Sequence, residues 1–393
     1  MSRKQRCQRC LLVAVTALAM GCSGSSSDEN FSGVAYPKRG PTFEAAGRRL
    51  GYVANRNSDT VSVLDLDAMA LLGSVPVGRG PVDIDGPRHV VIDAENGLGY
   101  VALSYPFSIP SPHQLTQGGV TQRSGYVEAL NLLDLSEAGE VRVDPNATDV
   151  AFSPATGRLA VTHMDLLLAL AADPDARRAN LVLVDPARSI ASSSATANRV
   201  KLCSAPAAVA FDGDGARVFV ACTGEDTVSV VDSQSGEVLS SVPAGDSLVN
   251  KPYALVTDPA RERLLVGNQV SYAVSIFDMN DSPNLLNTLH VLGVPMFPAL
   301  ISEGVVAVPF QNPSGASLFD VSTGKELVQV VFSETDCANP AEFSVTGDSR
   351  LRLVCEGDHY HPGAVIELNP ETLAITASVS VELYPERMGV LEP

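Results

Sequence analysis

Tryptophan is absent from the sequence, and histidine is scarce, with 6 residues in 393. Without tryptophan the protein cannot carry a tryptophan-derived quinone cofactor, and without a C-x-x-C-H motif it cannot attach a c-type haem covalently. The sequence also has no G-x-S-x-G elbow, no H-E-x-x-H motif and no phosphate-binding P-loop. No catalytic motif therefore identifies an activity, and any function must be argued from the fold.

Positive charge is also in short supply, with 27 Lys and Arg residues against 45 Asp and Glu. A chain with a net charge of −18 and no basic stripe repels phosphate backbones, so nucleic-acid binding is not expected. Hydrophobic residues make up 45% and charged residues only 18%, which excludes global disorder. The 31 glycines and 26 prolines favour many short strands joined by turns.

No apolar run is long enough to cross a membrane. The longest near the N-terminus is "LLVAVTALAM", ten residues that follow the basic segment 3–9 and are typical of a secretory signal. The following "ALAMGCSGSSSDEN" resembles a bacterial lipoprotein box, which implies cleavage after Gly21 and lipidation of Cys22. Ordinary signal cleavage nearby is the alternative, and both predict export.

These features divide the chain into a signal peptide (1–21), a lipid-anchored flexible tether (22–34) and one domain (35–393). Removal of residues 1–21 leaves 23 basic against 45 acidic residues. Ser23, directly after Cys22, resembles the signal for sorting to the outer membrane in Gram-negative bacteria. We therefore expect a cell-envelope protein that contacts the membrane through its lipid alone.

One pattern recurs along the domain: alternating apolar residues that end in Asp or Asn. The seven copies end at Asp65, Asn131, Asp185, Asp232, Asp278, Asp320 and Asn369. A period above 40 residues with strand-like alternation predicts an all-β, seven-bladed β-propeller with four antiparallel strands in each blade. The side chain of the terminal Asp or Asn is expected to bond the backbone of the turn that follows.

The segments Gly51–Pro81 and Ala216–Gly245 carry the repeat in full: a strand, a polar turn, the Asp-ending strand and an outer strand. They resemble the YVTN-type β-propeller repeats of bacterial surface proteins. The resemblance covers about residues 45 to 393 and implies the fold, but no particular activity, because propellers host many functions.

The last residues, "ERMGVLEP" (386–393), have the pattern of an innermost strand without a blade of its own. We expect them to complete blade 1 and close the ring, which would remove an open sheet edge. The segment 35–45 is the alternative source of that strand.

Four cysteines remain in the domain and allow three pairings. The repeat register places Cys222 and Cys355 at the ends of second strands, and Cys203 and Cys337 in the preceding connections at the same end of a blade. This register predicts disulfides Cys203–Cys222 and Cys337–Cys355, within blades 4 and 7, and an oxidising compartment. A four-cysteine zinc site is the rival, but blades 4 and 7 are too far apart for it; free buried thiols are the other alternative.

Two connections between second and third strands are enlarged, at 104–125 in blade 2 and at 163–179 in blade 3. The run "MDLLLALAA" in the latter predicts two helical turns. The blades are neighbours, so we expect the insertions to meet and cover part of one face. Long loops on a rigid scaffold commonly carry binding sites.

Histidines concentrate at that same end of the blades. In an extended segment His359 and His361 would point the same way, as two ligands of one metal ion must. The candidate ligands of this metal site are His359, His361, His113, His163 and Asp165, with Glu356 or Asp358 as further oxygen donors. Histidines that only bond backbone groups are the alternative, and no cofactor beyond this single ion is indicated.

Three functions remain open for this monomeric propeller. The first is a binding scaffold that engages a protein or small molecule at the face with the insertions. The second is a lactonase-like hydrolase, for which a base and cationic groups would converge at the channel mouth; the candidates are Arg79, Arg88, His89 and Arg123. The third is a metal-binding protein that supports a redox partner.

Overall fold

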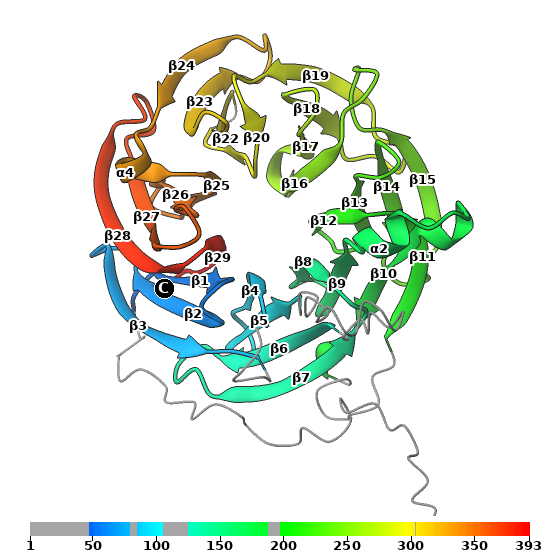
Figure 1. Ribbon diagram of the computed structural model, residues 1–393, viewed down its shortest axis with the longest axis horizontal. Helices are drawn as coiled ribbons and strands as arrows, with labels where there is room; N and C mark the ends of the chain where they lie inside the picture. The colour runs from blue at the N-terminus through cyan, green and yellow to red at the C-terminus, as the bar shows by residue number, and fades with distance from the viewer. Residues whose placement is uncertain (1–46, 79–84, 105–124, 188–196, 303) are drawn as a thin grey trace, which may run out of the picture. The chain divides into compact units, whose positions relative to one another are not determined.

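The computed structural model describes residues 47–78, 85–104, 125–187, 197–302 and 304–393, all within one compact unit, Val34–Pro393. Seven antiparallel sheets are arranged in a ring around a central axis, as predicted (Figure 1), and we call the region along this axis the channel. Six sheets have four strands, and the sheet of blade 6 has a fifth because its inner strand is split in two. In the described residues no helix is long and apolar enough to cross a membrane.

The first strand of each blade lies at the channel and the last lies at the outer rim. Blade 1 has, from the channel outward, β29 (Pro385–Leu391), β1 (Leu50–Asn55), β2 (Thr60–Asp65) and β3 (Ala70–Pro76); blade 2 has β4 (Pro87–Asp93), β5 (Leu98–Leu103), β6 (Gly125–Asn131) and β7 (Glu137–Val143). Blade 3 has β8 (Ala147–Ser153), β9 (Arg158–His163), β10 (Arg178–Val184) and β11 (Asn198–Ser204); blade 4 has β12 (Pro206–Phe211), β13 (Arg217–Cys222), β14 (Thr227–Asp232) and β15 (Val238–Pro243). Blade 5 has β16 (Pro252–Asp258), β17 (Arg263–Asn268), β18 (Ala273–Asp278) and β19 (Leu285–His290); blade 6 has β20 (Val294–Pro295), β21 (Ala299–Leu300), β22 (Val305–Gln311), β23 (Gly315–Asp320) and β24 (Glu326–Val331). Blade 7 has β25 (Pro340–Val345), β26 (Leu351–Cys355), β27 (Pro362–Leu368) and β28 (Ile375–Leu383). The helices are short: α2 (Leu166–Ala169), η2 (Asp175–Arg177), η3 (Pro259–Arg261) and α4 (Glu334–Cys337).

The middle strands of each blade are buried on both faces, because the two neighbouring blades cover them. Apolar clusters fill the spaces between blades, for example where Leu50 and Val63 of blade 1 meet Leu130 of blade 2. The Asp that ends a third strand caps the next turn as predicted. Asp232 Oδ1, for instance, accepts hydrogen bonds from the backbone N–H groups of Gln234 and Ser235 at 3.0 and 2.7 Å.

The C-terminal strand closes the ring (Figure 1). β29 pairs with β1 in antiparallel register, with Leu50 opposite Leu391 and Tyr52 opposite Gly389, so the prediction for residues 386–393 is confirmed. The alternative segment, 35–45, lies outside the described residues.

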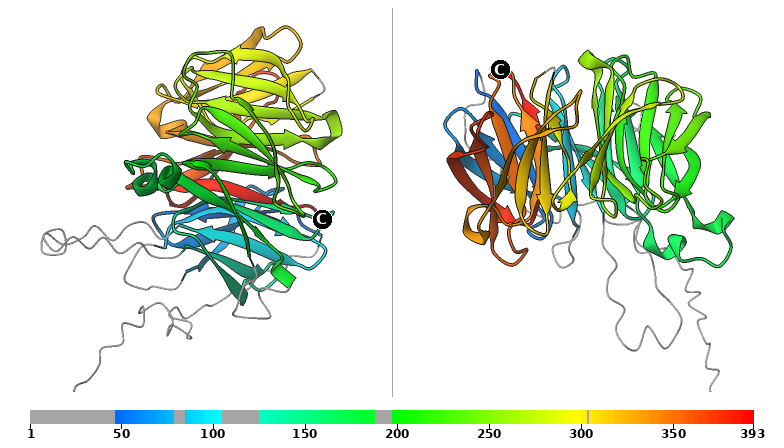
Figure 2. Two further views of the ribbon diagram at one scale, coloured as in Figure 1. Left: turned by 90° about the vertical axis from the view of Figure 1, so that its right-hand side faces the viewer. Right: turned by 90° about the horizontal axis from the view of Figure 1, so that it is seen from above.

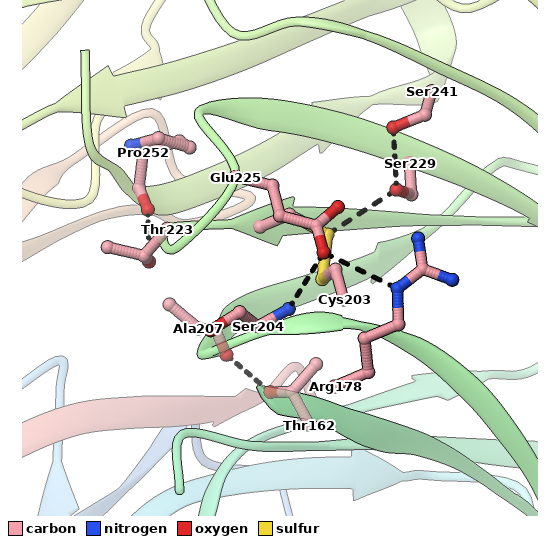
Figure 3. The surroundings of a disulfide bond; sticks show 11 residues. Thr162, Arg178, Cys203, Ser204, Ala207, Thr223, Glu225, Ser229, Ser241 and Pro252 are labelled. Atoms are coloured by element: carbon pink, nitrogen blue, oxygen red, sulfur yellow. Dashed lines mark hydrogen bonds and ion pairs between the residues drawn. A yellow bond between two sulfur atoms is a disulfide. The ribbon is translucent and has the colours of Figure 1, made fainter. Parts of the chain in front are cut away.

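Both predicted disulfides are present, with Cα–Cα distances of 5.9 Å for Cys203–Cys222 and 5.2 Å for Cys337–Cys355. This pairing also rules out the zinc alternative, because all four thiols are used. One placement differs from the prediction: Cys203 lies in β11, the outer strand of blade 3, so its bond to Cys222 ties blade 3 to blade 4 (Figure 3). Cys337 lies, as predicted, in the connection before an inner strand, in α4 between blades 6 and 7, and its bond ties this connection to β26 of blade 7.

The enlarged connections lie where the sequence placed them, between β5 and β6 and between β9 and β10. Residues 105–124 of the first are outside the described residues, so the contact between the two insertions stays a prediction. The second holds α2, a single four-residue helix rather than two turns, followed by η2. Figure 2 shows α2 at one face of the ring, with the C-terminus at the other. We call the face with α2 the insertion face and the other the opposite face.

Candidate functional site

All seven inner strands begin at the insertion face, and six of them begin in the same way. The residue before the strand has a left-handed backbone: Gly86, Asn146, Ala205, Lys251, Asn339 and Tyr384, with φ between 50° and 62°. The pairing of the inner strand with its neighbour then shifts register within its first residues, as in a β-bulge. Bulges re-aim side chains. Most of the residues one or two places after these strand starts line the mouth of the channel: Arg88, Thr148, Asp149, Ala207, Ala208, Tyr253, Ala341, Glu386 and Arg387.

Charged side chains from four blades meet at this point. We call them the channel cluster: Arg56, Arg88, His89, Asp149, Glu342, Glu356, Glu386 and Arg387. Arg387 of β29 is central, because its guanidinium pairs with Asp149 of blade 3 and with Glu342 of blade 7, both at 2.7 Å. The C-terminal strand therefore both closes the ring and completes the cluster.

Ion pairs continue on the insertion side of Arg387. Glu386 pairs with Arg88 at 2.9 Å and with Arg56 at 3.0 Å. Arg88 also reaches the hydroxyl of Tyr253, in blade 5, at 3.3 Å. The mouth is thus cross-linked by polar contacts between several blades, which fixes the positions of its side chains.

Two carboxyl groups of the cluster have shifted pKa values of opposite sign. Burial alone would raise the pKa of Asp149, but Arg387, His89 and the Val209 N–H outweigh it and hold that pKa below its usual value. Burial raises the pKa of Glu356, and the nearby charge of Glu386 adds to this, against the lowering effect of His359. Asp149 is therefore ionised at neutral pH, whereas Glu356 binds a proton more readily than a free glutamate does.

The mouth at the insertion face is nearly filled by its own side chains. The free space between Arg88, Tyr253, Phe297, Glu386 and their neighbours is about 20 Å³, room for about one water molecule. A small organic ligand does not fit between these groups, so whatever binds here must rest on the outside of the face.

The predicted residues fall into three groups. Arg88 and His89 lie in the channel cluster, in agreement with their predicted position near the channel mouth. Arg79, Arg123 and His113 lie outside the described residues.

His359 and His361 are not arranged as expected, because segment 357–361 is a turn and not an extended segment. His359 has a φ of 69°, stacks on Tyr384 with ring centroids 3.7 Å apart, and bonds Glu356 at 2.9 Å. His361 is 81% exposed and bonds Asp358. The two rings therefore engage different neighbours.

His163 and Asp165 have local structural contacts. The His163 ring is buried, its Nδ1 lies 3.0 Å from the Asn180 carbonyl, and burial lowers its pKa to about 4. Asp165 accepts a hydrogen bond from the Leu168 N–H in α2. Among the residues that the structure describes, no three His, Cys, Asp or Glu side chains are placed to bind a metal ion.

Exposed apolar side chains distinguish the two faces of the described ring. The insertion face carries Leu166, Leu168, Leu170, Leu248, Val249, Val270, Tyr272, Leu292 and Tyr360 in its connections. The opposite face carries Leu133 and Val345. Leu248 is 98% exposed and Tyr360 84% exposed.

Sequence reasoning missed Asp149, Glu342, Glu386 and Arg387. A signal was available: most inner strands begin with proline, and the two residues after it line the channel. An alignment of the blades on "PRH", "PAE" and "PER" places His89, Glu342 and Arg387 at one equivalent position.

Ring and site together define the class of this protein: a seven-bladed β-propeller with a charged channel mouth. No family model and no curated protein matches the sequence. Solved structures match the fold. A functionally unknown protein from Desulfotomaculum acetoxidans has a TM-score of 0.63 at 12% identity, over 88% of this chain and 99% of that one. A periplasmic gluconolactonase from Pseudomonas aeruginosa has a TM-score of 0.58 at 14% identity, over 88% of this chain and 100% of that one. A dihydro-heme d1 dehydrogenase has a TM-score of 0.58 at 16% identity, over 91% of this chain and 78% of that one. At these identities the likeness concerns the fold alone.

Proposed function

We propose that this protein is an exported, lipid-anchored propeller that binds a macromolecular partner, a protein, on its insertion face. The observation that carries the proposal is the concentration of exposed apolar side chains on that face. Exposed apolar side chains that gather on one face of a molecule favour a protein interface there. The filled mouth supports a large partner over a small ligand, since only about 20 Å³ is free within it.

Export and anchoring have their own support and test. Two disulfides require an oxidising compartment to form and persist. Cys22→Ser should release the protein from the membrane fraction into the soluble fraction, with folding unchanged. A Cys22→Ser protein that stays with the membrane would contradict lipid anchoring and leave partner binding untouched.

The partner surface is tested by removing its apolar groups. Wild-type protein extracted in mild detergent from its native envelope should elute as a complex in size-exclusion chromatography, and the triple variant Leu248→Ser/Tyr272→Ser/Leu292→Ser should not. The matched control changes three exposed outer-strand residues, Leu71→Ser/Leu239→Ser/Leu327→Ser, and should keep the complex. A monomeric wild type, or equal complexes for all three proteins, would refute the proposal.

A further inference from the structure

The channel has a second cavity, on the opposite-face side of the channel cluster. It has a volume of about 330 Å³ and is formed by the inner strands of blades 2 to 5 together with Arg387. Small-molecule sites commonly begin at roughly 300 Å³. This cavity can therefore hold a compact organic ligand, whereas the mouth at the insertion face cannot.

A histidine–carboxylate pair lies at the inner end of this cavity. His89 lines it, and its Nδ1 lies 2.8 Å from Oδ1 of Asp149. Asp149 is held in turn by Arg387 at 2.7 Å and by the Val209 N–H at 3.1 Å. With Nδ1 oriented by a buried carboxylate, the other nitrogen, Nε2, is available as a proton acceptor; no described residue forms a hydrogen bond with it that the structure records.

We propose that this cavity is a hydrolytic site in which His89 acts as general base toward apolar carboxylic esters or lactones. His89 Nε2 takes a proton from a water molecule as the water oxygen bonds to the acyl carbon. The acyl C–O bond then breaks, and His89 returns the proton to the departing alkoxide. The products are an acid and an alcohol, or one hydroxy acid from a lactone, and no other reactant is needed.

Charged neighbours match this reaction. Asp149 stabilises the imidazolium that forms when His89 takes the proton. Arg387 lines the same cavity, and its positive charge favours the negative charge that develops on the carbonyl oxygen. Asp149 is therefore a positioning residue for His89.

The cavity walls set the substrate class. Half-buried Val91, Phe152, Ala210 and Val256 line it, with Phe211 and Leu255 beside them. The side chains of the polar lining residues already bond protein groups: Ser153 bonds the Thr156 N–H, Asp212 bonds Arg217 and Thr257 bonds the Phe211 carbonyl. The hydroxyl groups of a sugar lactone would lose hydrogen bonds to water against such walls without gaining enough partners. An aromatic or alkyl ester or lactone has no hydroxyl groups to desolvate, so the site favours it over D-glucono-1,5-lactone.

The test is hydrolysis of dihydrocoumarin and phenyl acetate by the full chain, with D-glucono-1,5-lactone in parallel. Wild type should hydrolyse the two aromatic substrates with saturation, faster than the sugar lactone. His89→Gln should lower kcat at least about 100-fold, whereas the same change at the exposed outer-strand residue, His290→Gln, should leave it unaltered.

A second variant tests the site if His89→Gln fails to fold. Ala210→Phe fills part of the cavity while His89 and Asp149 are both retained, and should raise KM or abolish turnover while His290→Gln does not. No hydrolysis above buffer, equal rates for wild type and His89→Gln, or preference for the sugar lactone would overturn the proposal. The insertion-face triple variant should hydrolyse the aromatic substrates at the wild-type rate, so failure of the hydrolysis proposal and failure of the partner proposal can be distinguished.

Discussion

At the scale of single residues, burial decides the state of the ionisable groups. His163 is the clearest case, because its ring is enclosed and its Nε2 has no hydrogen-bond partner in the described structure. A proton added there would be buried without a partner, which is why burial lowers the pKa to about 4.

This shift predicts a pH dependence of stability. The unfolded state binds the proton at higher pH than the folded state does, so the free energy of unfolding falls as the pH drops from about 6.5 to about 4. His163 lowers the free energy of unfolding by about 3 kcal/mol over this pH range. His163→Gln should remove it, as measured by urea unfolding between pH 7 and 4. His290→Gln is the control, and parallel curves for wild type and His163→Gln would contradict the assignment.

Residue-level prediction from sequence succeeded where the repeat set the position and failed where a turn did. Cys203 and Cys222 could be paired because the register aligns them with equivalent positions in other blades. His359 was misplaced because period-2 reasoning assumes an extended chain, and Gly357–His361 is a turn. The partnership of His89, Asp149 and Arg387 joins residues 60 and 238 positions apart, which no local pattern encodes.

At the scale of elements, the closing strand β29 depends on close packing against blade 2. A Cβ on Gly389 would lie 2.4 Å from the Val90 carbonyl oxygen and 3.0 Å from Ile92 Cγ1. No side chain fits there without moving one inner strand from the next.

Gly389→Ala should therefore lower the free energy of unfolding by about 1–3 kcal/mol. Gly304→Ala is the matched control, because a Cβ there has nothing within 4 Å. Thermal unfolding of the two variants measures the difference. Equal melting temperatures would contradict the packing of β29 against blade 2.

The disulfides act between elements as well, since Cys203–Cys222 joins β11 of blade 3 to β13 of blade 4. Replacing both cysteines by alanine should cost about 3 kcal/mol for a loop of this size. The Cys337→Ala/Cys355→Ala pair should cost a similar amount, and the two losses should add because the bonds are far apart. Denaturant unfolding of the single and combined pairs checks this; a combined loss well below the sum would show that the bonds share one role.

At the scale of the whole molecule, the ring has two faces, and the channel cluster lies between them in the channel. The number of blades, their order and the closure by residues 386–393 were predictable, because they follow from the repeat and from the cost of an open sheet edge. The division of the channel into a filled mouth and an open cavity was not predictable, because it depends on β-bulges that turn pairs of residues toward the channel. In the described residues, the connections of the insertion face carry most of the exposed apolar side chains and its centre is filled by the channel cluster, whereas the opposite-face side of the channel holds the open cavity.

The protein as a whole is acidic, with a net charge of −18. We therefore expect a partner of the insertion face to offer apolar side chains together with basic ones. Complex formation should weaken as salt rises, although the apolar contacts should keep part of it. A complex that strengthens steadily with salt would contradict the electrostatic part of this expectation.

The most direct test of the central claim is site-specific photocrosslinking in the native envelope. A photoreactive phenylalanine derivative would replace Leu248 or Leu292 on the insertion face, or Leu133 on the opposite face. Our account predicts one crosslinked species of the same mass from Leu248 and Leu292 and none from Leu133. Crosslinks from Leu133 alone, or no crosslinks from any position, would contradict a partner on the insertion face.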